Sequence, residues 1–289
     1  MHLITFVHGS SERVGVLTAK GDQVLDLSRA TPGLPTDMVG YLGAGKSALA
    51  MARALLAKPE PAWLIARADV TLCAPVPRPG KLICLGHNYF DHMEGGRTEP
   101  PEFPTLFCKT ANTIIGPDQP VVMPTMTAQV DYEAELAVVI GLRGKNITED
   151  NALRLVAGYT IFNDVSARDF QKRTSQWMLG KSFDTFGPMG PALVTADEVG
   201  DPQTLDLWLT LNGLELQRSN TRHMIFSVPY IIAYLTTVMT LEPGDVISTG
   251  TPAKAALAKA IPPFMKPGDV VSISISKLGE LTNPIIAAN

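Results

Sequence analysis

Residues 131–140 read DYEAELAVVI, an acidic half followed directly by an apolar half. The apolar run at 135–140 predicts a strand that ends at Gly141. Because side chains alternate along a strand, Glu133 and Glu135 should share one face, about 7 Å apart. Carboxylates that close repel each other unless a cation lies between them, and oxygen-only ligands suit Mg²⁺, Mn²⁺ or Ca²⁺. The stretch therefore predicts either a metal site or a solvated strand face.

The next apolar stretch, residues 156–162, is also followed by polar residues. Asp164 stands at the end of that predicted strand, where a third oxygen ligand could converge with the first two. Lys181 stands alone among turn residues (GKSFDTFGP, 180–188). Beside a divalent ion its ammonium could neutralise a substrate carboxylate or enolate, and an ordinary surface lysine is the alternative.

Hydroxyl and imidazole groups stand at two further predicted strand ends. Residues 249–252 (TGTP) follow a short apolar strand and offer hydroxyl and N–H groups to an anion, with a plain turn as the alternative. Residues 86–94 (GHNYFDHME) contain two of the five histidines, His87 and His92, next to acidic residues. Histidine is the usual general base near neutral pH, so these two are candidates for catalysis or for a structural role.

The composition limits the class of protein. Of 289 residues, 45% are hydrophobic and 18% are charged, so the chain can bury a sizeable core. At roughly 150 residues per domain this length allows about two domains. Its 24 Gly and 23 Pro favour a β-rich fold with many tight turns. The net charge of −4 argues against a general nucleic-acid binder, so we expect no nucleic-acid partner.

Cysteine content and hydropathy favour a soluble protein of the cytoplasm. The three cysteines, Cys73, Cys84 and Cys108, have neither the number nor the spacing of a disulfide framework or a zinc site. No apolar stretch approaches the ~20 residues that span a bilayer. Residues 1–13 (MHLITFVHGSSER) lack the pattern of a secretory signal. We therefore expect no membrane partner.

A Pro-rich segment at residues 75–80 (PVPRPG) predicts a domain junction. We expect a small N-terminal α/β domain at 1–75 and a larger, β-rich α+β domain at 76–289. The predicted strands are 3–7, 14–17, 23–27, 70–74, 81–86, 135–140, 246–248 and 270–275, and the predicted helices are 47–56 and two that begin after Thr148 and Ser227.

Residues 40–47 (GYLGAGKS) match the P-loop pattern G-x-x-x-x-G-K-S. In a P-loop the backbone N–H groups cradle phosphates, with Lys46 on the terminal phosphates and Ser47 on Mg²⁺. That motif needs a buried strand directly before it, whereas residues 30–39 contain two prolines and a turn composition. We therefore expect a Gly-rich turn before a surface helix and keep a nucleotide-binding protein as a third hypothesis.

In order and spacing, the motifs of residues 81–286 resemble the fumarylacetoacetate hydrolase family. The stretch 176–195 is most similar to the branch that contains the mitochondrial domain-2 proteins and their acylpyruvase-like bacterial relatives. The motifs are G-x-N-Y-x-x-H (86–92), F-x-K…GP (107–117), DYEAEL (131–136), GYTIFNDVSARDFQ (158–171), QWMLGKSFDTFGPMGPALVT (176–195), NGLELQRSNTRHMIF (212–226) and LEPGDVISTGTP (241–252).

The resemblance implies a catalytic domain with the family's mixed β-sandwich roll, a small N-terminal domain and a homodimer. It implies Mg²⁺ or Mn²⁺, or else Ca²⁺, on carboxylates that match Glu133, Glu135 and Asp164. It also assigns candidate roles to other residues. These are catalysis for His92, Lys181 and Glu94, and substrate contact for His87, Tyr89, Arg168, Gln171 and Thr251.

Two activities follow from the resemblance. The main hypothesis is a hydrolase that cleaves a C–C bond in an acylpyruvate-like or 1,3-diketo acid of the fumarylacetoacetate or fumarylpyruvate type, with His92 activating water. The alternative is a decarboxylase or isomerase of oxaloacetate- or 2-hydroxymuconate-type oxo acids on the same metal site.

Three departures from the family pattern bear on that choice. Hydrolytic relatives carry Glu three residues after the histidine, but that position is Gly95 here and Glu94 lies one residue early. On a helical turn such a shift rotates a side chain by ~100°. His87 replaces an arginine or a small or apolar residue, and residues 249–256 (TGTPAKAA) lose the glycines of the usual TGTP-x-G-V-G. The last two changes could reshape the pocket.

Overall fold

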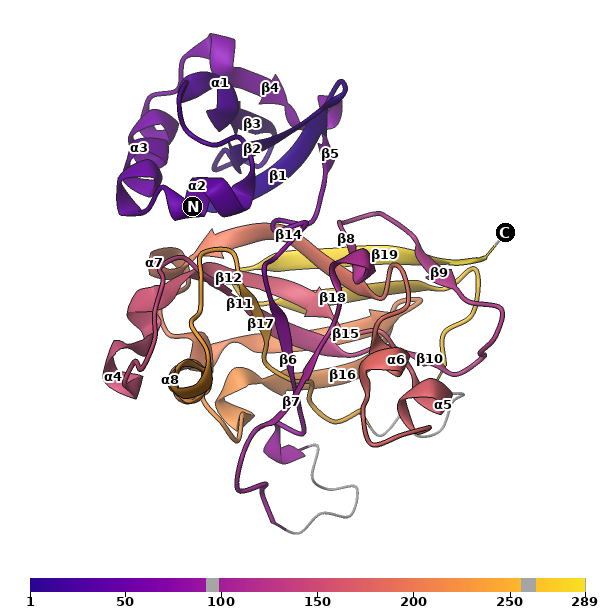
Figure 1. Ribbon diagram of the computed structural model, residues 1–289. Coiled ribbons are helices and arrows are strands. Elements are labelled where there is room, and N and C mark those ends of the chain that lie inside the picture. Colours follow the sequence, from indigo (N-terminus) through magenta and orange to yellow (C-terminus); the bar gives the residue numbers. More distant parts are fainter. Residues whose placement is uncertain (92–98, 256–263, 289) are drawn as a thin grey trace.

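The computed structural model describes residues 1–91, 99–255 and 264–288 (Figure 1). The strands are β1 (His2–His8), β2 (Ser11–Leu17), β3 (Gln23–Asp26), β4 (Leu64–Ala66), β5 (Thr71–Leu72), β6 (Leu82–Gly86), β7 (Thr105–Cys108), β8 (Ile114–Ile115), β9 (Val121–Met123), β10 (Val130–Asp131), β11 (Ala134–Ile140), β12 (Val156–Asn163), β13 (Ser166–Ala167), β14 (Gly187–Thr195), β15 (Asp206–Leu211), β16 (Leu214–Asn220), β17 (Val246–Ser248), β18 (Val270–Ile275) and β19 (Gly279–Ala287). The α-helices are α1 (Leu27–Ala30), α2 (Met38–Gly43), α3 (Lys46–Ala57), α4 (Glu149–Ala152), α5 (Arg168–Gln171), α6 (Met178–Lys181), α7 (Ala196–Val199) and α8 (Val228–Val238). Short 3-10 turns are η1 (Pro61–Trp63), η2 (Arg67–Asp69), η4 (Ala111–Thr113), η5 (Leu153–Leu155), η6 (Pro202–Thr204) and η7 (Thr221–His223).

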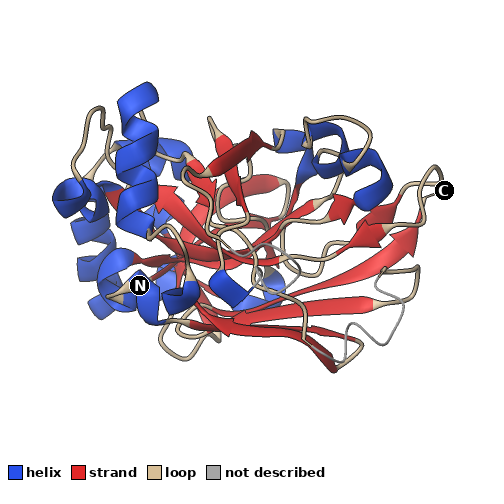
Figure 2. Ribbon diagram, turned by 90° about the horizontal axis from the view of Figure 1, so that it is seen from below, coloured by secondary structure: helices blue, strands red, loops and turns tan. Residues whose placement is uncertain are grey.

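The described strands form a large sheet, a smaller sheet and one isolated pair. Neighbours in the large sheet run in the order β4, β3, β2, β1, β14, β12, β11, β17, β6, β7, with β5 beside β1 and β8 beside β14. The smaller sheet is ordered β16, β15, β18, β19, β9, and β10 pairs with β13. Strands fill the middle of the molecule and helices gather at its two sides (Figure 2). The β-rich α+β class expected from the sequence is confirmed.

Strand β11 lies between two hydrophobic cores. All of its residues are buried, as expected for a nearly continuous apolar run. Val138 belongs to the core that contains the smaller sheet and α8, whereas Val139 belongs to the core that contains the N-terminal strands. Successive side chains of the strand therefore face opposite cores, which fixes its register and with it the position of Glu135.

The N-terminal elements form a lobe that joins the large sheet through β1, drawn in indigo above β14 (Figure 1). Strand β1 pairs antiparallel with β14, with Leu3 opposite Leu193. Tyr41 of the lobe and Met189 of β14 belong to the same core cluster. Residues 1–75 thus share both a sheet and a core with the rest of the chain, and the domain boundary near residue 75 stays a prediction.

The P-loop interpretation of residues 40–47 is wrong. The first part of this stretch lies inside α2 and the last part begins α3, with Gly45 at φ 80° between them. Asp37 caps α2, since its carboxylate accepts a hydrogen bond of 2.8 Å from the Gly40 N–H. Residues 31–37 are turns rather than a buried strand, so this segment has no phosphate cradle.

Candidate metal centre and active site

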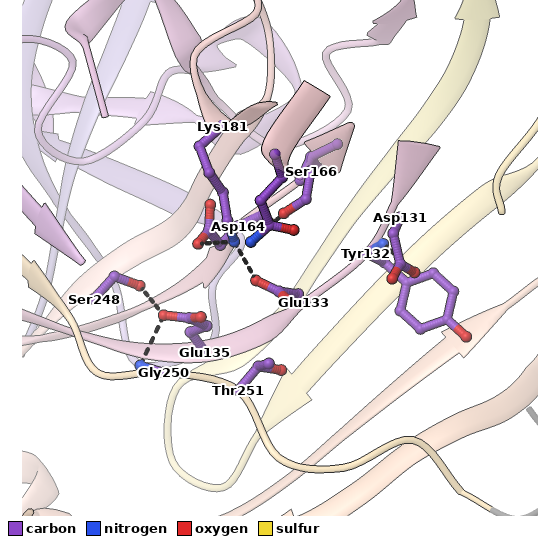
Figure 3. Close-up of polar contacts among 12 residues, drawn as sticks. Asp131, Tyr132, Glu133, Glu135, Asp164, Ser166, Lys181, Ser248, Gly250 and Thr251 are labelled. Atoms are coloured by element: carbon purple, nitrogen blue, oxygen red, sulfur yellow. Dashed lines mark hydrogen bonds and ion pairs between the residues drawn. The ribbon is translucent and has the colours of Figure 1, made fainter. Parts of the chain in front are cut away.

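Three buried carboxylates converge where β11 begins and β12 ends (Figure 3). Glu133, Glu135 and Asp164 each offer one oxygen, and these oxygens all lie within 4.8 Å of one another. The pairing of Ala134 with Asn163 brings the two strand ends together, and the Asp164 N–H donates to the Glu133 carbonyl at 3.0 Å. The structure therefore assembles the three ligands predicted from the sequence.

Glu135 is held from the end of β17 and from the loop that follows it. The Ser248 hydroxyl donates to Glu135 Oε2 at 2.5 Å, and the Gly250 N–H donates to the same oxygen at 2.9 Å (Figure 3). Oε1 is left without a protein donor among the described residues. Support of this kind on one oxygen orients a carboxylate whose other oxygen binds a metal.

Cations hold the other two carboxylates. Lys181 Nζ bridges them, at 2.5 Å from Glu133 Oε2 and 2.7 Å from Asp164 Oδ2 (Figure 3). Arg168 lies 2.5 Å from Glu133 Oε1, and Lys109 Nζ lies 2.7 Å from Asp164 Oδ1. Lys181 is 2% exposed, so it is a buried member of the site rather than a surface lysine.

The electrostatics of the cluster suit a cation. Burial, together with the charges of Asp164 and Glu133, raises the pKa of Glu135 well above its usual range. Burial opposes ionisation of Glu133 as well, but Arg168 and Lys181 outweigh it and lower the pKa of that carboxyl. The negative charge of Glu135 is thus the least compensated of the three. Three carboxylate oxygens in such a position fit a hard divalent ion such as Mg²⁺ or Mn²⁺.

Lys181 stays an ammonium in this setting. Burial alone would lower its pKa, but the charges of Asp164 and Glu133 outweigh burial and raise it. The ammonium also lies 4.9 Å from the centre of the Phe107 ring, a cation–π contact. It can therefore supply positive charge and N–H groups to a substrate, but not a general base at neutral pH.

A cavity of about 550 Å³ opens above the carboxylates. Five of the residues predicted from the sequence to act on substrate line it, and aromatic and polar side chains form the rest of its wall. The predicted residues are His87, Arg168, Gln171, Lys181 and Thr251, and the others are Leu85, Gly86, Phe107, Asp131, Glu133, Glu135, Lys172, Thr174, Trp177 and Phe264.

His87 stands on a tight turn at the cavity wall. Its φ of 57° lies in the left-handed region that residues other than glycine seldom adopt, and such positions gather at functional sites. The ring packs edge-on against Trp177, with centroids 5.4 Å apart. Trp177 in turn covers Gly86, where a Cβ would lie 2.3 Å from the indole. The last residue of β6 therefore has to be glycine if the indole is to keep its place.

Tyr89 departs from the sequence prediction. It is fully buried in the core that contains Met224 and Phe226, and it does not line the cavity. The turn at His87 sends the chain inward, and Asn88 fixes it there by donating to the Thr249 carbonyl at 2.7 Å. We therefore correct the assignment of Tyr89 from substrate contact to core. His92 and Glu94 lie outside the described residues.

Arg168 is held by several partners at once. Its Nε donates to Asp131 Oδ2 and its Nη1 to Gln171 Oε1, both at 2.9 Å, in addition to the contact with Glu133. Asp131 is held from the other side by Lys254 at 2.6 Å. The predicted contact of Arg168 with substrate stays a prediction, and the structure shows Arg168 bracing the Glu133 carboxylate.

Sequence reasoning missed four polar residues of this site. Each stands in a motif quoted from the sequence (F-x-K, DYEAEL, NGLELQ or TGTPAKAA), but no local pattern gave it a role at the site. The four residues are Lys109, Asp131, Gln217 and Lys254. Lys254 occupies a position where the family pattern has glycine, so the lost glycine brings a new ion pair.

Comparisons with known proteins agree with this geometry. The family model described as fumarylacetoacetate (FAA) hydrolase C-terminal matches residues 81–286. The mitochondrial oxaloacetate tautomerase of Rattus norvegicus is 43% identical over 99% of this chain and 92% of its own length. Fumarylacetoacetate hydrolase from Exiguobacterium antarcticum is 34% identical, with a TM-score of 0.86 over 100% of both chains. Maleylpyruvate hydrolase from a Sphingobium species, solved with manganese(II) and pyruvate, is 31% identical, with a TM-score of 0.82 over 100% of both chains.

In residues 1–91, 99–255 and 264–288, no helix has the length and apolar character of a membrane span.

The matched family model covers most of the chain, and the relatives match it almost from end to end. The buried carboxylate cluster lies inside the matched region. The chain is therefore an enzyme of the fumarylacetoacetate hydrolase family.

Proposed function

We propose that this enzyme is a divalent-metal-dependent isomerase that interconverts the keto and enol forms of oxaloacetate or a closely related 2-oxo dicarboxylate. The observation that carries the proposal is the 43% identity, over 99% of the chain, to a protein named as an oxaloacetate tautomerase. This favours the alternative of the sequence analysis over the C–C hydrolase.

The charges around the cavity support a substrate with two negative charges. Among the described residues of the cluster, three carboxylates form ion pairs with four cations, and the fourth carboxylate, Glu135, forms none. The eight groups together sum to zero charge when all are ionised. They are Asp131, Glu133, Glu135 and Asp164, with Lys109, Arg168, Lys181 and Lys254. Glu135 is ionised once a cation lies beside it. A divalent ion would then leave two positive charges in excess, which suits a dianion such as oxaloacetate.

The residues of the site fit the chemistry of enolisation. A divalent ion on Glu133, Glu135 and Asp164 would act as a Lewis acid toward a 2-oxo acid and stabilise its enolate. Lys181 adds a fixed positive charge where the enolate oxygen forms, and burial strengthens that interaction. Arg168 keeps Glu133 in place for that role.

C–C hydrolysis is the second candidate. Its support is the likeness in fold, over the full length of both chains, to the maleylpyruvate hydrolase. Hydrolysis also needs a group that activates water, and the glutamate that relatives place three residues after the histidine is Gly95 here. Keto–enol isomerisation needs no attacking water, so that substitution leaves it possible.

Three finer features belong to the same proposal. We propose Mg²⁺ or Mn²⁺ as the metal, supported by the oxygen-only ligand set and by the manganese in the Sphingobium structure. We propose a homodimer, as the family resemblance implies. The cytoplasmic location expected from the sequence stays a prediction, because the similar tautomerase is named mitochondrial.

The test compares three reactions on one metal-stripped preparation. With Mg²⁺ or Mn²⁺ restored, we expect the enzyme to accelerate loss of enol-oxaloacetate absorbance without forming pyruvate, and to act weakly on acylpyruvates. Glu135→Gln should abolish the acceleration, whereas Glu149→Gln, the same change at an exposed position on α4, should preserve it. Faster acylpyruvate hydrolysis than isomerisation, or full activity in the presence of chelator, would overturn the proposal.

A further inference from the structure

Gln217 of β16 is a buried amide with every polar atom engaged. Its Oε1 accepts from the Ala134 N–H at 3.0 Å, and its Nε2 donates to the Pro252 carbonyl at 2.8 Å and to Thr251 Oγ1 at 2.9 Å. A backbone N–H can only donate and a carbonyl can only accept. The Ala134 N–H therefore identifies the oxygen end of the amide, and the Pro252 carbonyl independently identifies the nitrogen end. Both N–H groups of Nε2 are used.

The fixed amide determines what the Thr251 hydroxyl can do. Its oxygen accepts from Gln217, and the described part of the chain offers its proton no acceptor. Thr251 lines the cavity and lies beside the Glu133–Glu135 pair (Figure 3). The bond from Gln217 occupies one lone pair of Thr251 Oγ1 and turns the hydroxyl proton away from the amide. Here it is held ready to donate to a molecule in the cavity.

Gln171 is oriented in the same way on another wall of the cavity. The Arg168 guanidinium has no acceptor atom, so the oxygen of the Gln171 amide faces it at 2.9 Å. The Nε2 group of Gln171 is then the end that remains available, and Gln171 also lines the cavity. Two side chains from separate elements thus each present a donor to the cavity.

We propose that Gln217 is a positioning residue that holds the Thr251 hydroxyl with its proton facing the cavity. This hydroxyl and Gln171 Nε2, both already predicted to contact substrate, then form a two-donor cradle for the carboxylate of a 2-oxo acid. The substrate class rests on the proposed function, whereas the coupling of Gln217 to Thr251 does not. Donors set before the ligand arrives need no reorganisation when an anion binds. The two donors should therefore favour an anion such as a carboxylate over a cationic group at the same place.

A double-mutant cycle tests this coupling. The probe is pyruvate, titrated calorimetrically into the Mn²⁺-loaded enzyme, with the KM and kcat for oxaloacetate measured alongside. We expect Thr251→Val and Gln217→Met each to weaken pyruvate binding about 10- to 100-fold, the range for a hydrogen bond to a charged group. The double variant should bind no more weakly than the worse single variant, because both changes remove the same donor.

Matched variants separate positioning from folding. Thr251→Ser should restore binding, and Gln23→Met, the same change at an exposed site in β3, should leave it unchanged. Mn²⁺ affinity should be the same in all folded variants. If Gln217→Met does not fold, Gln217→Glu replaces it. The glutamate carboxylate would accept a hydrogen bond from the Thr251 hydroxyl, so this variant should likewise abolish the benefit of the hydroxyl.

Each outcome decides one proposal. Additive losses, in which the change at Gln217 weakens pyruvate binding equally in the Thr251→Val background, would overturn the positioning role. Coupling in pyruvate binding without turnover of oxaloacetate would sustain the cradle and overturn the proposed function. Isomerisation of oxaloacetate without coupling in pyruvate binding would sustain the proposed function and overturn the positioning role of Gln217.

Discussion

At the scale of single residues, a change at Lys181 should separate metal binding from catalysis. Its ammonium bridges Glu133 and Asp164 and adds positive charge to the cavity. In Lys181→Met we expect kcat to fall about 100- to 1,000-fold, because the enolate loses one preorganised charge. Mn²⁺ should bind at least as tightly, because removal of the ammonium leaves more carboxylate charge for the ion. Steady-state kinetics and calorimetric Mn²⁺ titration check both.

Lys172 supplies the control for this prediction. It lines the same cavity but is exposed and forms no ion pair in the described part of the chain. Lys172→Met should change kcat less than about 10-fold. A Lys181→Met enzyme that keeps its kcat, or that no longer binds Mn²⁺, would contradict the assigned role.

The buried charge of Glu135 should lower the stability of the metal-free protein. Burial and the neighbouring carboxylates disfavour its charge, so Glu135→Gln should raise the Tm of the metal-free protein by roughly 2–4 °C. The same variant should lose the rise in Tm that Mn²⁺ gives the unaltered protein. Thermal unfolding with chelator and with Mn²⁺ measures both effects. A lower metal-free Tm would mean that Glu135 is mainly a structural hydrogen-bond acceptor.

Local patterns predict only part of such a site. Alternation in a strand placed Glu133 and Glu135 on one face, and a strand end placed Asp164 beside them. Gln217 lies 83 residues from Ala134, its partner, so spacing along the chain could not reveal the pair. Tyr89 was misassigned for a different reason: the direction of its side chain depends on the left-handed backbone at His87, which the sequence pattern does not reveal.

At the scale of elements, the contact between α5 and α6 sets the distance between Gln171 and Lys181. Gly180 makes that contact, and a Cβ there would lie 2.4 Å from the backbone nitrogen of Gln171. Backbone cannot yield as a flexible side chain does, so Gly180→Ala should push the two helices apart. We expect kcat/KM to fall at least 10-fold as Gln171 and Lys181 move apart, with Mn²⁺ affinity retained, because neither residue is a proposed metal ligand.

Gly43 is the matched control for that substitution. It is also helical, in α2, and a Cβ there meets nothing within 4 Å. Gly43→Ala should leave kinetics unchanged and stabilise the protein by about 0.5–1 kcal/mol, the usual gain of alanine over glycine in a helix. Equal effects of the two substitutions on kcat/KM would show that the α5–α6 spacing does not matter.

Elements with a strong local pattern were predictable, and those decided by tertiary contacts were not. The apolar runs of β6, β11 and β17 and the Ala-rich α3 match their predicted ranges closely. The helix expected after Thr148 is only the single turn α4 followed by η5, and the Thr148 side chain makes no capping bond. Residues 40–43 read as a glycine turn in sequence but form helix, because Asp37 caps them.

At the scale of the whole molecule, the shared core joins residues 1–75 to the site. Leu3 and Tyr41 pack in one cluster with Ala137 and Phe162. Ala137 belongs to β11 and Phe162 to β12, the strands whose ends bring the three clustered carboxylates together. Loss of the lobe would therefore reach the carboxylate cluster through those two strands.

We therefore predict that the full chain unfolds in one cooperative transition and that residues 76–289 alone do not fold stably. Without residues 1–75, β14 would lose β1 as a neighbour and the apolar residues beneath the lobe would face water. Calorimetry of the full chain should give a single transition, and its Tm should rise as a whole when Mn²⁺ is added. Two transitions, of which Mn²⁺ shifts only one, would instead show that the lobe is an independent domain. A soluble 76–289 fragment that binds Mn²⁺ with the affinity of the full chain would lead to the same conclusion.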